Sequence, residues 1–252
     1  MTTIIHMSDI HLGAHGMAEA FEEIVQKLEA MTAQAADYVV CLTGDLVENA
    51  RNGGHNQMAS QYISRLTNAG LHVLAIPGNH DYGTGSHGEK EHINRFKRMA
   101  YGSVNVFYPK LDFIDGTAFI GLDSMAEELN FIDAAWAEGE LGSLQRERLE
   151  EMLDWPEVQN ADFRVVYLHH HPFDDIPFMQ LKDSHLLKEI LEGRHVDVLL
   201  YGHNHKGKEA HGTWGIPVCL DASSTTGKNT DPTPVRTITL TPGQPITVGE
   251  LS

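Results

Sequence analysis

Short apolar runs alternate with longer amphipathic stretches in the first third of the chain. The runs predict strands over Thr3–Met7, Tyr38–Leu42 and Leu71–Ile76. Between them, apolar residues spaced three and four apart predict helices over Met17–Ala35 and Asn56–Asn68. Strands and helices that alternate in this way are typical of a parallel sheet with right-handed crossovers.

The rest of the chain mixes short strands with helices, which predicts a second sheet. Helices are expected over Glu89–Ala100, from a cap at Ser143 to about Leu153, and over Ser184–Leu191. Strands are expected over Val104–Tyr108, Leu111–Ile114, Thr117–Leu122, Phe163–Leu168, Val196–Tyr201, Ile216–Leu220, Val235–Leu240 and Ile246–Glu250. Asp115-Gly116 is expected to form a tight hairpin turn. The polar stretch Ala126–Gly142 is typical of a long surface loop. No shift in composition marks a linker, so we expect residues 1–252 to form a single domain with helices on the outer faces of two sheets.

Composition and charge restrict the classes of function. The hydrophobic content of 41% is ordinary for a soluble globular protein. The net charge of -17 argues against extended binding along nucleic acid, although bound cations can invert the local field around a small phosphate. Cys41 and Cys219 lie in apolar runs and are expected to be buried thiols. The N-terminus does not resemble a signal peptide, and no run approaches the roughly 20 apolar residues of a membrane span, so a cytoplasmic protein is expected.

Five polar blocks follow the apolar runs or contain a glycine. They are Asp9-Ile10-His11, Gly44-Asp45, Gly78-Asn79-His80-Asp81, His169-His170-His171 and Gly202-His203-Asn204-His205. In open α/β sheets, ligands bind at the carboxyl ends of the strands, where several of these blocks fall. Side chains two apart in an extended segment point the same way, so Asp9 with His11 and His203 with His205 can each reach one ion.

The remaining ligand types fit a centre with two metal ions. The two oxygens of the Asp45 carboxylate can bridge two ions, Asn79 offers an amide oxygen, and His169 offers a ring nitrogen. His170 is the alternative ligand in the triple-histidine run. Mixed oxygen and imidazole ligands suit Mn, Fe, Zn, Co or Ni better than Ca. Two such ions about 3.5–4 Å apart clamp an in-line displacement and lower the pKa of a bridging water.

Read in order, the five blocks resemble the calcineurin-like metallophosphoesterases over nearly the whole chain. The resemblance implies an α/β fold, a four-layer α/β/β/α sandwich with two mixed β-sheets. It implies one divalent ion held by Asp9, His11, Asp45 and His205, and a second held by Asp45, Asn79, His169 and His203. It places His80 outside the ligand set against the phosphate, with Asp81 as its orienting partner. The family often has an acidic residue four positions after the bridging Asp. Here Glu48 lies three positions after it, so no role is assigned to Glu48.

Among relatives, the Asp-Ile-His-Leu start and the His-His-His-Pro run are most similar to bacterial class III cyclic-nucleotide and glycerophosphodiester phosphodiesterases. The expected function is therefore hydrolysis of a small-molecule phosphodiester, in which hydroxide held by the two ions attacks phosphorus. The alternatives are a phosphomonoesterase, a nuclease of the same fold and a non-catalytic metal-binding scaffold. Ser8 to Gly13 also resembles the opening of DNA-repair nucleases. The presence of every expected ligand counts against the scaffold. No pattern in the sequence indicates an oligomeric state.

Overall fold

The computed structural model describes residues 1–83, 90–125, 139–174, 179–230 and 233–251. Its first sheet contains the strand–helix repeats of the N-terminal part of the chain. The strand order is β10-β9-β1-β2-β3. The strands are β1 (Thr2–Met7), β2 (Tyr38–Thr43), β3 (His72–Ile76), β9 (Arg236–Leu240) and β10 (Thr247–Glu250). β1, β2 and β3 are parallel, while β9 runs antiparallel to β1 and β10 antiparallel to β9.

The second sheet has the order β4-β5-β6-β7-β8. Its strands are β4 (Lys110–Ile114), β5 (Thr117–Gly121), β6 (Phe163–Tyr167), β7 (Val198–Tyr201) and β8 (Val218–Asp221). β5 to β8 are parallel, and β4 pairs antiparallel with β5. Asp115 and Gly116 join β4 to β5 with φ values of 46° and 77°, as a tight hairpin turn requires. Both sheets are therefore mixed, as predicted.

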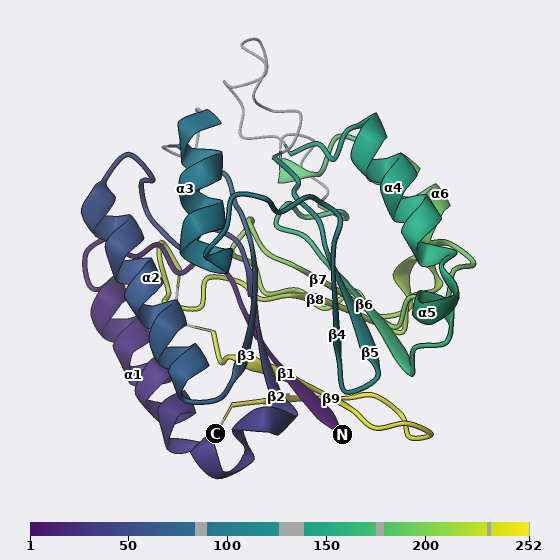
Figure 1. Cartoon of the computed structure of the whole chain (residues 1–252), viewed down its shortest axis with the longest axis horizontal. Helices are drawn as coiled ribbons and strands as arrows, with labels where there is room; N and C mark the ends of the chain where they lie inside the picture. Colours follow the sequence, from purple (N-terminus) through teal and green to yellow (C-terminus); the bar gives the residue numbers. More distant parts are fainter. Residues whose placement is uncertain (84–89, 126–138, 175–178, 231–232, 252) are drawn as a thin grey trace.

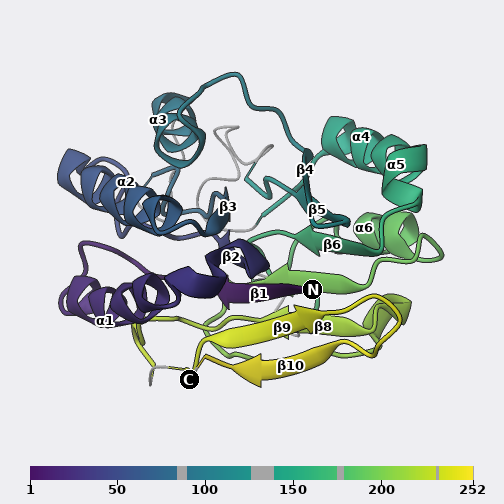
Figure 2. The same cartoon turned by 60° about the horizontal axis from the view of Figure 1, so that its bottom comes forward.

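Helices cover the outer face of each sheet (Figure 1, Figure 2). The first sheet is covered by α1 (Met17–Ala30), α2 (Gly53–Asn68) and α3 (Lys90–Tyr101). The second is covered by α4 (Ser143–Leu153), α5 (Pro156–Gln159) and α6 (Ser184–Leu191). Two short 3₁₀ helices, η1 (Thr32–Asp37) and η3 (Thr213–Gly215), lie between these elements. The predicted four-layer α/β/β/α sandwich is confirmed.

Alternating side chains divide the core into two clusters. In β1, Ile4 belongs to the cluster that includes the second sheet, and Ile5 belongs to the cluster that includes Phe21 of α1. Both faces of the central strands are therefore buried, which explains why their sequences read as continuous apolar runs. Cys41 and Cys219 are buried free thiols. Within the described residues, no helix combines the length and apolar character needed to cross a bilayer.

Three local predictions are wrong. Val104–Tyr108 forms no strand, because its β-favouring side chains find no neighbouring strand to pair with, and Phe107 is 73% exposed. The helix expected to reach Ala35 ends at Ala30 and is followed by η1.

The third error concerns the start of α4. The cap of this helix is Gly142, with no side-chain cap bond, and Ser143 is its first helical residue. The Asp183 carboxylate instead accepts the Leu141 and Gly142 N–H groups. Of the predicted surface loop Ala126–Gly142, residues 126–138 lie outside the described part of the chain.

Candidate metal centre

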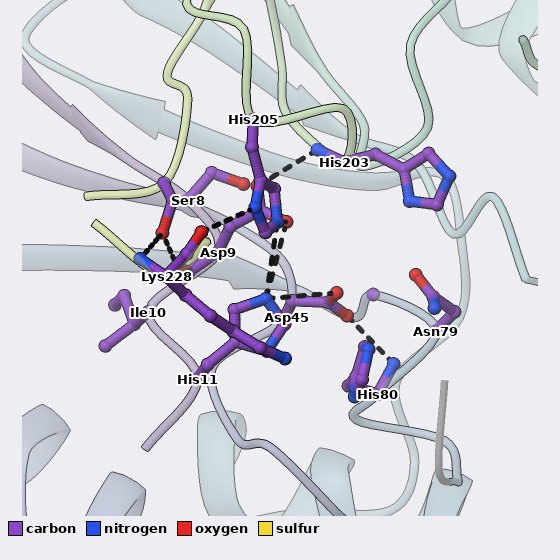
Figure 3. A network of polar contacts seen from close by, with 12 residues as sticks. Ser8, Asp9, Ile10, His11, Asp45, Asn79, His80, His203, His205 and Lys228 are labelled. Atoms are coloured by element: carbon purple, nitrogen blue, oxygen red, sulfur yellow. Dashed lines mark hydrogen bonds and ion pairs between the residues drawn. The ribbon is translucent and has the colours of Figure 1, made fainter. Parts of the chain in front are cut away.

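The seven expected ligands come together at the carboxyl ends of parallel strands from both sheets. Figure 3 shows this rim, with Asp9, His11, Asp45, Asn79, His203 and His205 labelled. The strands that deliver them are β1, β2, β3, β6 and β7. The sheets are joined at this edge by hydrogen bonds between their loops, including one from the His203 N–H to Asp9 Oδ2 at 3.0 Å. The fold therefore positions on one rim side chains that lie up to 196 residues apart.

Asp9, His11 and His205 form the first group. His205 Nε2 lies 3.1 Å from Asp9 Oδ1 and 3.4 Å from His11 Nε2. His11 Nε2 is 3.9 Å from Asp9 Oδ1. One ligand atom from each residue lies within 4.8 Å of the others, which is close enough for a single ion to contact all three.

Asn79, His169 and His203 form the second group. His169 Nε2 lies 3.1 Å from Asn79 Oδ1 and 3.2 Å from His203 Nδ1. All three side chains present ligand atoms to one point, and His169 is completely buried. The two groups lie on opposite sides of Asp45.

Asp45 connects the two groups through a single oxygen. Its Oδ2 atom is 3.8 Å from His11 Nε2 and 3.6 Å from His169 Nε2. Its Oδ1 atom accepts a hydrogen bond from the His80 N–H at 2.8 Å, which fixes the orientation of the carboxylate. This is the position that a bridging ligand between two ions occupies.

Hydrogen bonds on the far side of the rings determine which nitrogen faces the site. His169 Nδ1 lies 2.8 Å from the Thr43 carbonyl oxygen, and His205 Nδ1 lies 3.1 Å from that of Lys228. A carbonyl oxygen only accepts, so both Nδ1 atoms carry the proton and both Nε2 atoms present lone pairs inward. Inward lone pairs beside carboxylate oxygens repel one another unless cations lie among them. The residues therefore fit divalent metal ions.

Backbone strain is concentrated at the same residues. Asp9, His11, Asp45, His203 and His205 all have positive φ values, between 51° and 78°. Each such residue costs of the order of 1–3 kcal/mol, and such strain persists where the surrounding structure holds the conformation. An extended strand would place Asp9 and His11 on one face, as the sequence suggests. The structure brings them together through a left-handed turn instead.

Three glycines allow the loops to approach closely. A Cβ atom on Gly44 would lie 2.6 Å from His169 Nδ1, and one on Gly202 would lie 2.5 Å from Asp9 Oδ2. A Cβ atom on Gly78 would lie 2.5 Å from the Asp45 backbone nitrogen. A side chain at any of these positions would displace a member of the site, which explains why three of the five sequence blocks contain a glycine.

Electrostatics favour charged carboxylates next to imidazoles. Burial raises the pKa of Asp9 and Asp45, but the adjacent histidines outweigh it and hold both pKa values below the ordinary range. Burial lowers the pKa of His169 and His205, yet the two carboxylates raise both above the ordinary value. Burial and the neighbouring His169 lower the pKa of His203 to about 3. The two carboxylates thus stay charged at neutral pH, and their negative charge attracts cations.

His80 lies at the edge of the site, where its ring centroid is 4.7 Å from that of His11. Its Nδ1 atom donates to the Glu48 carbonyl oxygen at 2.7 Å. The expected partner, Asp81, is buried, and its carboxylate accepts the N–H groups of Gly78, Leu46 and Val47. Asp81 therefore holds the two loops together, and the Glu48 carbonyl orients the His80 ring instead.

The triple-histidine run divides its side chains among different partners. His169 points into the site, as described above. His170 Nδ1 pairs with Ser124 Oγ at 2.7 Å, although a ligand atom of His170 also lies within 4.8 Å of His169 and His203. His171 Nδ1 accepts the Phe173 N–H. His169 is thus the member that contacts both Asn79 and Asp45.

Two residues at the site were not predicted from the sequence. Glu48 Oε2 lies 3.1 Å from His11 Nδ1, and Lys228 Nζ lies 3.2 Å from the same nitrogen. Glu48 follows Gly44-Asp45 in the sequence, but its spacing of three positions from Asp45 gave no reason to assign it a role. Lys228 follows β8, far from the five polar blocks, and no sequence pattern indicates it.

Comparisons with known proteins identify the family of the chain. The family model described as calcineurin-like phosphoesterase matches residues 2–207. The chain is 26% identical over 233 residues to a probable cyclic nucleotide phosphodiesterase of Rhodococcus erythropolis, covering 88% of this chain and 70% of the relative. It is 25% identical to a cAMP/cGMP dual specificity phosphodiesterase of Mycobacterium tuberculosis, covering 88% and 67%.

A nuclease-related protein and a solved structure extend the similarity. The DNA double-strand break repair protein Mre11 of Haloferax volcanii is 25% identical over 96% of this chain, which spans half of that relative's length. The crystal structure of TT1561 from Thermus thermophilus superimposes with a TM-score of 0.59 at 14% identity, covering 99% of this chain and 98% of that one. This structural likeness concerns the fold. The family match over most of the sequence shows that the chain belongs to the calcineurin-like phosphoesterases.

Proposed function

We propose that this protein hydrolyses a small-molecule phosphodiester, such as a cyclic nucleotide, with two divalent ions. The observation that carries the proposal is the position of Asp45 Oδ2, between His11 Nε2 and His169 Nε2 at 3.8 and 3.6 Å. Asp9, His11, His205 and Asp45 would hold one ion. Asn79, His169, His203 and Asp45 would hold the other. When bound, two such ions supply a water of lowered pKa and positive charge for the phosphate oxygens.

His80 has the geometry of a group that moves a proton at the leaving oxygen. Its Nδ1 atom is engaged by the Glu48 carbonyl, so Nε2 is the nitrogen that faces a substrate. Imidazole side chains are the commonest general acids and bases in enzymes, which suits this role. The buried Asp81 carboxylate keeps the loop that carries His80 in place through three backbone hydrogen bonds.

The preference for a diester rests on the relatives and on the charge of the chain. Two curated relatives are cyclic nucleotide phosphodiesterases by name. A net charge of -17 disfavours long polyanions, while a small phosphate needs only the local field of two bound cations.

A nuclease is the second candidate, because the Mre11 relative matches 96% of this chain. Purified protein should be tested in parallel on 3′,5′-cyclic AMP, a glycerophosphodiester, bis-p-nitrophenyl phosphate, p-nitrophenyl phosphate and short DNA, with metal analysis of the same sample. We expect the small diesters to be cleaved at least tenfold faster than the monoester and the DNA. A higher rate on DNA would favour the nuclease, and equal rates after complete metal removal would contradict the proposal.

A further inference from the structure

The stretch Ser223-Ser224-Thr225-Thr226-Gly227-Lys228 follows the carboxyl end of β8. It belongs to none of the polar blocks, yet it lies directly under the first group of candidate ligands. Its four hydroxyl residues are all buried, with exposed fractions between 0% and 4%. Four consecutive buried hydroxyl side chains need hydrogen-bond partners, and they find them in backbone groups of Ser8–Ile10 and of His205.

Three of the hydroxyl residues hold the segment Ser8–Ile10. Ser224 Oγ donates to the Asp9 carbonyl oxygen, and Thr226 Oγ1 donates to the Ile10 carbonyl oxygen, both at 2.9 Å. Thr225 pairs with Ser8 twice: Oγ1 accepts the Ser8 N–H, and the Thr225 N–H donates to the Ser8 carbonyl, both at 3.0 Å. Three successive residues of the stretch thus bind all three residues of Ser8–Ile10, with Thr225 on Ser8 and its two neighbours on Asp9 and Ile10.

The segment that is held in this way is strained. Asp9 and His11 both have a φ of 52°, so the backbone here leaves the extended conformation of β1. The hydroxyl groups of Ser224 and Thr226 satisfy two backbone carbonyls of this segment. Without them, the left-handed turn would relax, and the Asp9 and His11 side chains would move apart.

The same stretch also holds His205. Ser223 Oγ donates to the His205 carbonyl oxygen at 2.9 Å, and the Lys228 carbonyl accepts from His205 Nδ1 at 3.1 Å. The second bond turns His205 Nε2 toward Asp9 Oδ1 (Figure 3). The stretch Ser223–Lys228 therefore fixes the backbone of both Asp9 and His205, and it also fixes the ring of His205.

Lys228, the last residue of the stretch, lies beside His11, the third residue of the first group. The Lys228 ammonium pairs with Glu48 Oε2 at 2.5 Å, and that oxygen lies 3.1 Å from His11 Nδ1. Lys228 fixes the Glu48 carboxylate beside the outer nitrogen of His11, so that Nε2 faces the site. A carboxylate on the outer nitrogen of a histidine typically orients the ring and strengthens it as a metal ligand.

We propose that Ser223–Lys228 is a positioning element for one of the two ions, the one held by Asp9, His11, Asp45 and His205. This inference rests on the proposed two-ion function and goes beyond it, because it assigns affinity for one ion to residues that do not contact it. In the second group, the His169 ring is oriented by the Thr43 carbonyl at Nδ1 and not by this stretch. Substitutions in Ser223–Lys228 should therefore lower the metal affinity of the two sites unequally.

The test is a titration of Mn²⁺ into metal-free protein by calorimetry, with bound Mn²⁺ counted by electron paramagnetic resonance. Thr226→Val removes the hydroxyl group with little change in volume, and Thr226→Ser restores it. Thr67→Val is the matched control, because Thr67 Oγ1 donates to the Ile63 carbonyl at the same 2.9 Å, far from the site in α2. His205→Ala and His169→Ala identify which binding event belongs to which site.

We expect Thr226→Val to weaken the event that His205→Ala removes by about fivefold to tenfold, as loss of one buried hydrogen bond predicts. The other event should change by less than about twofold, and Thr226→Ser should bind like the wild type. Ser224→Ala is a smaller change and should weaken the same Mn²⁺ binding event. It replaces Thr226→Val as the test variant if Thr226→Val does not fold.

The inference would be overturned if Thr226→Val weakened both Mn²⁺ binding events equally or weakened neither. It would also be overturned if Thr226→Ser did not restore the affinity. Failure of the proposed function would look different, because the wild-type protein itself would then bind no Mn²⁺ at these residues.

Discussion

His80 donates a hydrogen bond from Nδ1 to the backbone carbonyl oxygen of Glu48, and the two atoms lie 2.7 Å apart. The bond fixes the ring beside the candidate metal ligands, although His80 belongs to neither group of three. His169 and His205 are held by the same kind of bond, and a ring nitrogen of His80 lies within 4.8 Å of ligand atoms of His11 and Asp45. The place of His80 at the edge of the site, where Nε2 can face a substrate oxygen, is what suits it to proton transfer.

Replacement of His80 should therefore separate catalysis from metal binding. His80→Ala should lower kcat by about 10²-fold or more, the usual contribution of a general acid, while the protein still binds the same amount of Mn²⁺. Rates on an aryl diester and metal content by mass spectrometry provide the measurement. His72→Ala, at an exposed position at the start of β3, is the control and should behave like the wild type. A parallel fall in metal content and rate would make His80 a ligand or a folding determinant.

Gly78 tests the close approach of the loops. The Cβ atom of Gly78→Ala would lie 2.5 Å from the Asp45 backbone nitrogen, which cannot move without moving the Asp45 carboxylate. We expect a loss of about 1–3 kcal/mol in the free energy of unfolding, together with weaker Mn²⁺ binding. Gly53→Ala is the matched control, because its Cβ meets nothing within 4 Å, and we expect it to leave both quantities unchanged or to stabilise the helix slightly. Indistinguishable behaviour of the two variants would argue against a tight contact at Gly78.

Metal binding should depend on pH through His169 and His205. The carboxylates outweigh burial and raise both pKa values, so these rings hold protons at a higher pH than ordinary histidines do. Ions bind only the deprotonated rings, so affinity should fall and proton release should rise as pH decreases from 8 toward 6. His203, with a pKa of about 3, should contribute nothing in this range. Calorimetry in two buffers of different ionisation enthalpy counts the protons, and a constant count from pH 8 to pH 6 would be inconsistent with these shifts.

Asp123 provides a pH effect on stability away from the candidate ligands. Burial raises its pKa to about 6, while the Tyr82 hydroxyl donates to its Oδ2 atom at 2.7 Å. A raised carboxyl pKa means that stability is full below pH 4 and is lost as pH rises through about 6, by up to about 3 kcal/mol. In metal-free protein, Asp123→Asn should therefore be more stable than the wild type at pH 8 and no more stable at pH 4. Urea unfolding at both values measures the difference, and a gap that is equal at both would rule out this assignment.

The sequence predicts most of the fold and the seven candidate ligands because both depend on local patterns. Apolar runs mark buried strands, and residues such as Asp45 and Asn79 directly follow them, so the topology of a parallel sheet brings them together. Val104–Tyr108 shows the limit of that reasoning, since its composition favours a strand while the fold offers it no partner.

Residues that act through tertiary contacts were not predictable in the same way. Ser224 contacts Asp9 across 215 positions of the chain, and Lys228 contacts Glu48 across 180. Serine, threonine and lysine after a strand are common, and only the pairing of β8 at the edge of the second sheet places them under the site. Asp81 was expected to orient His80, but three backbone N–H groups bind its carboxylate.

The central claim is that Asp45 lies between two metal ions. A crystal of the Mn²⁺-loaded protein, measured at the manganese absorption edge, locates each ion by its anomalous signal. The account predicts two peaks per chain, one bounded by Asp9, His11 and His205 and the other by Asn79, His169 and His203, with the Asp45 carboxylate in contact with both. A single peak, or two peaks of which Asp45 touches only one, would contradict it.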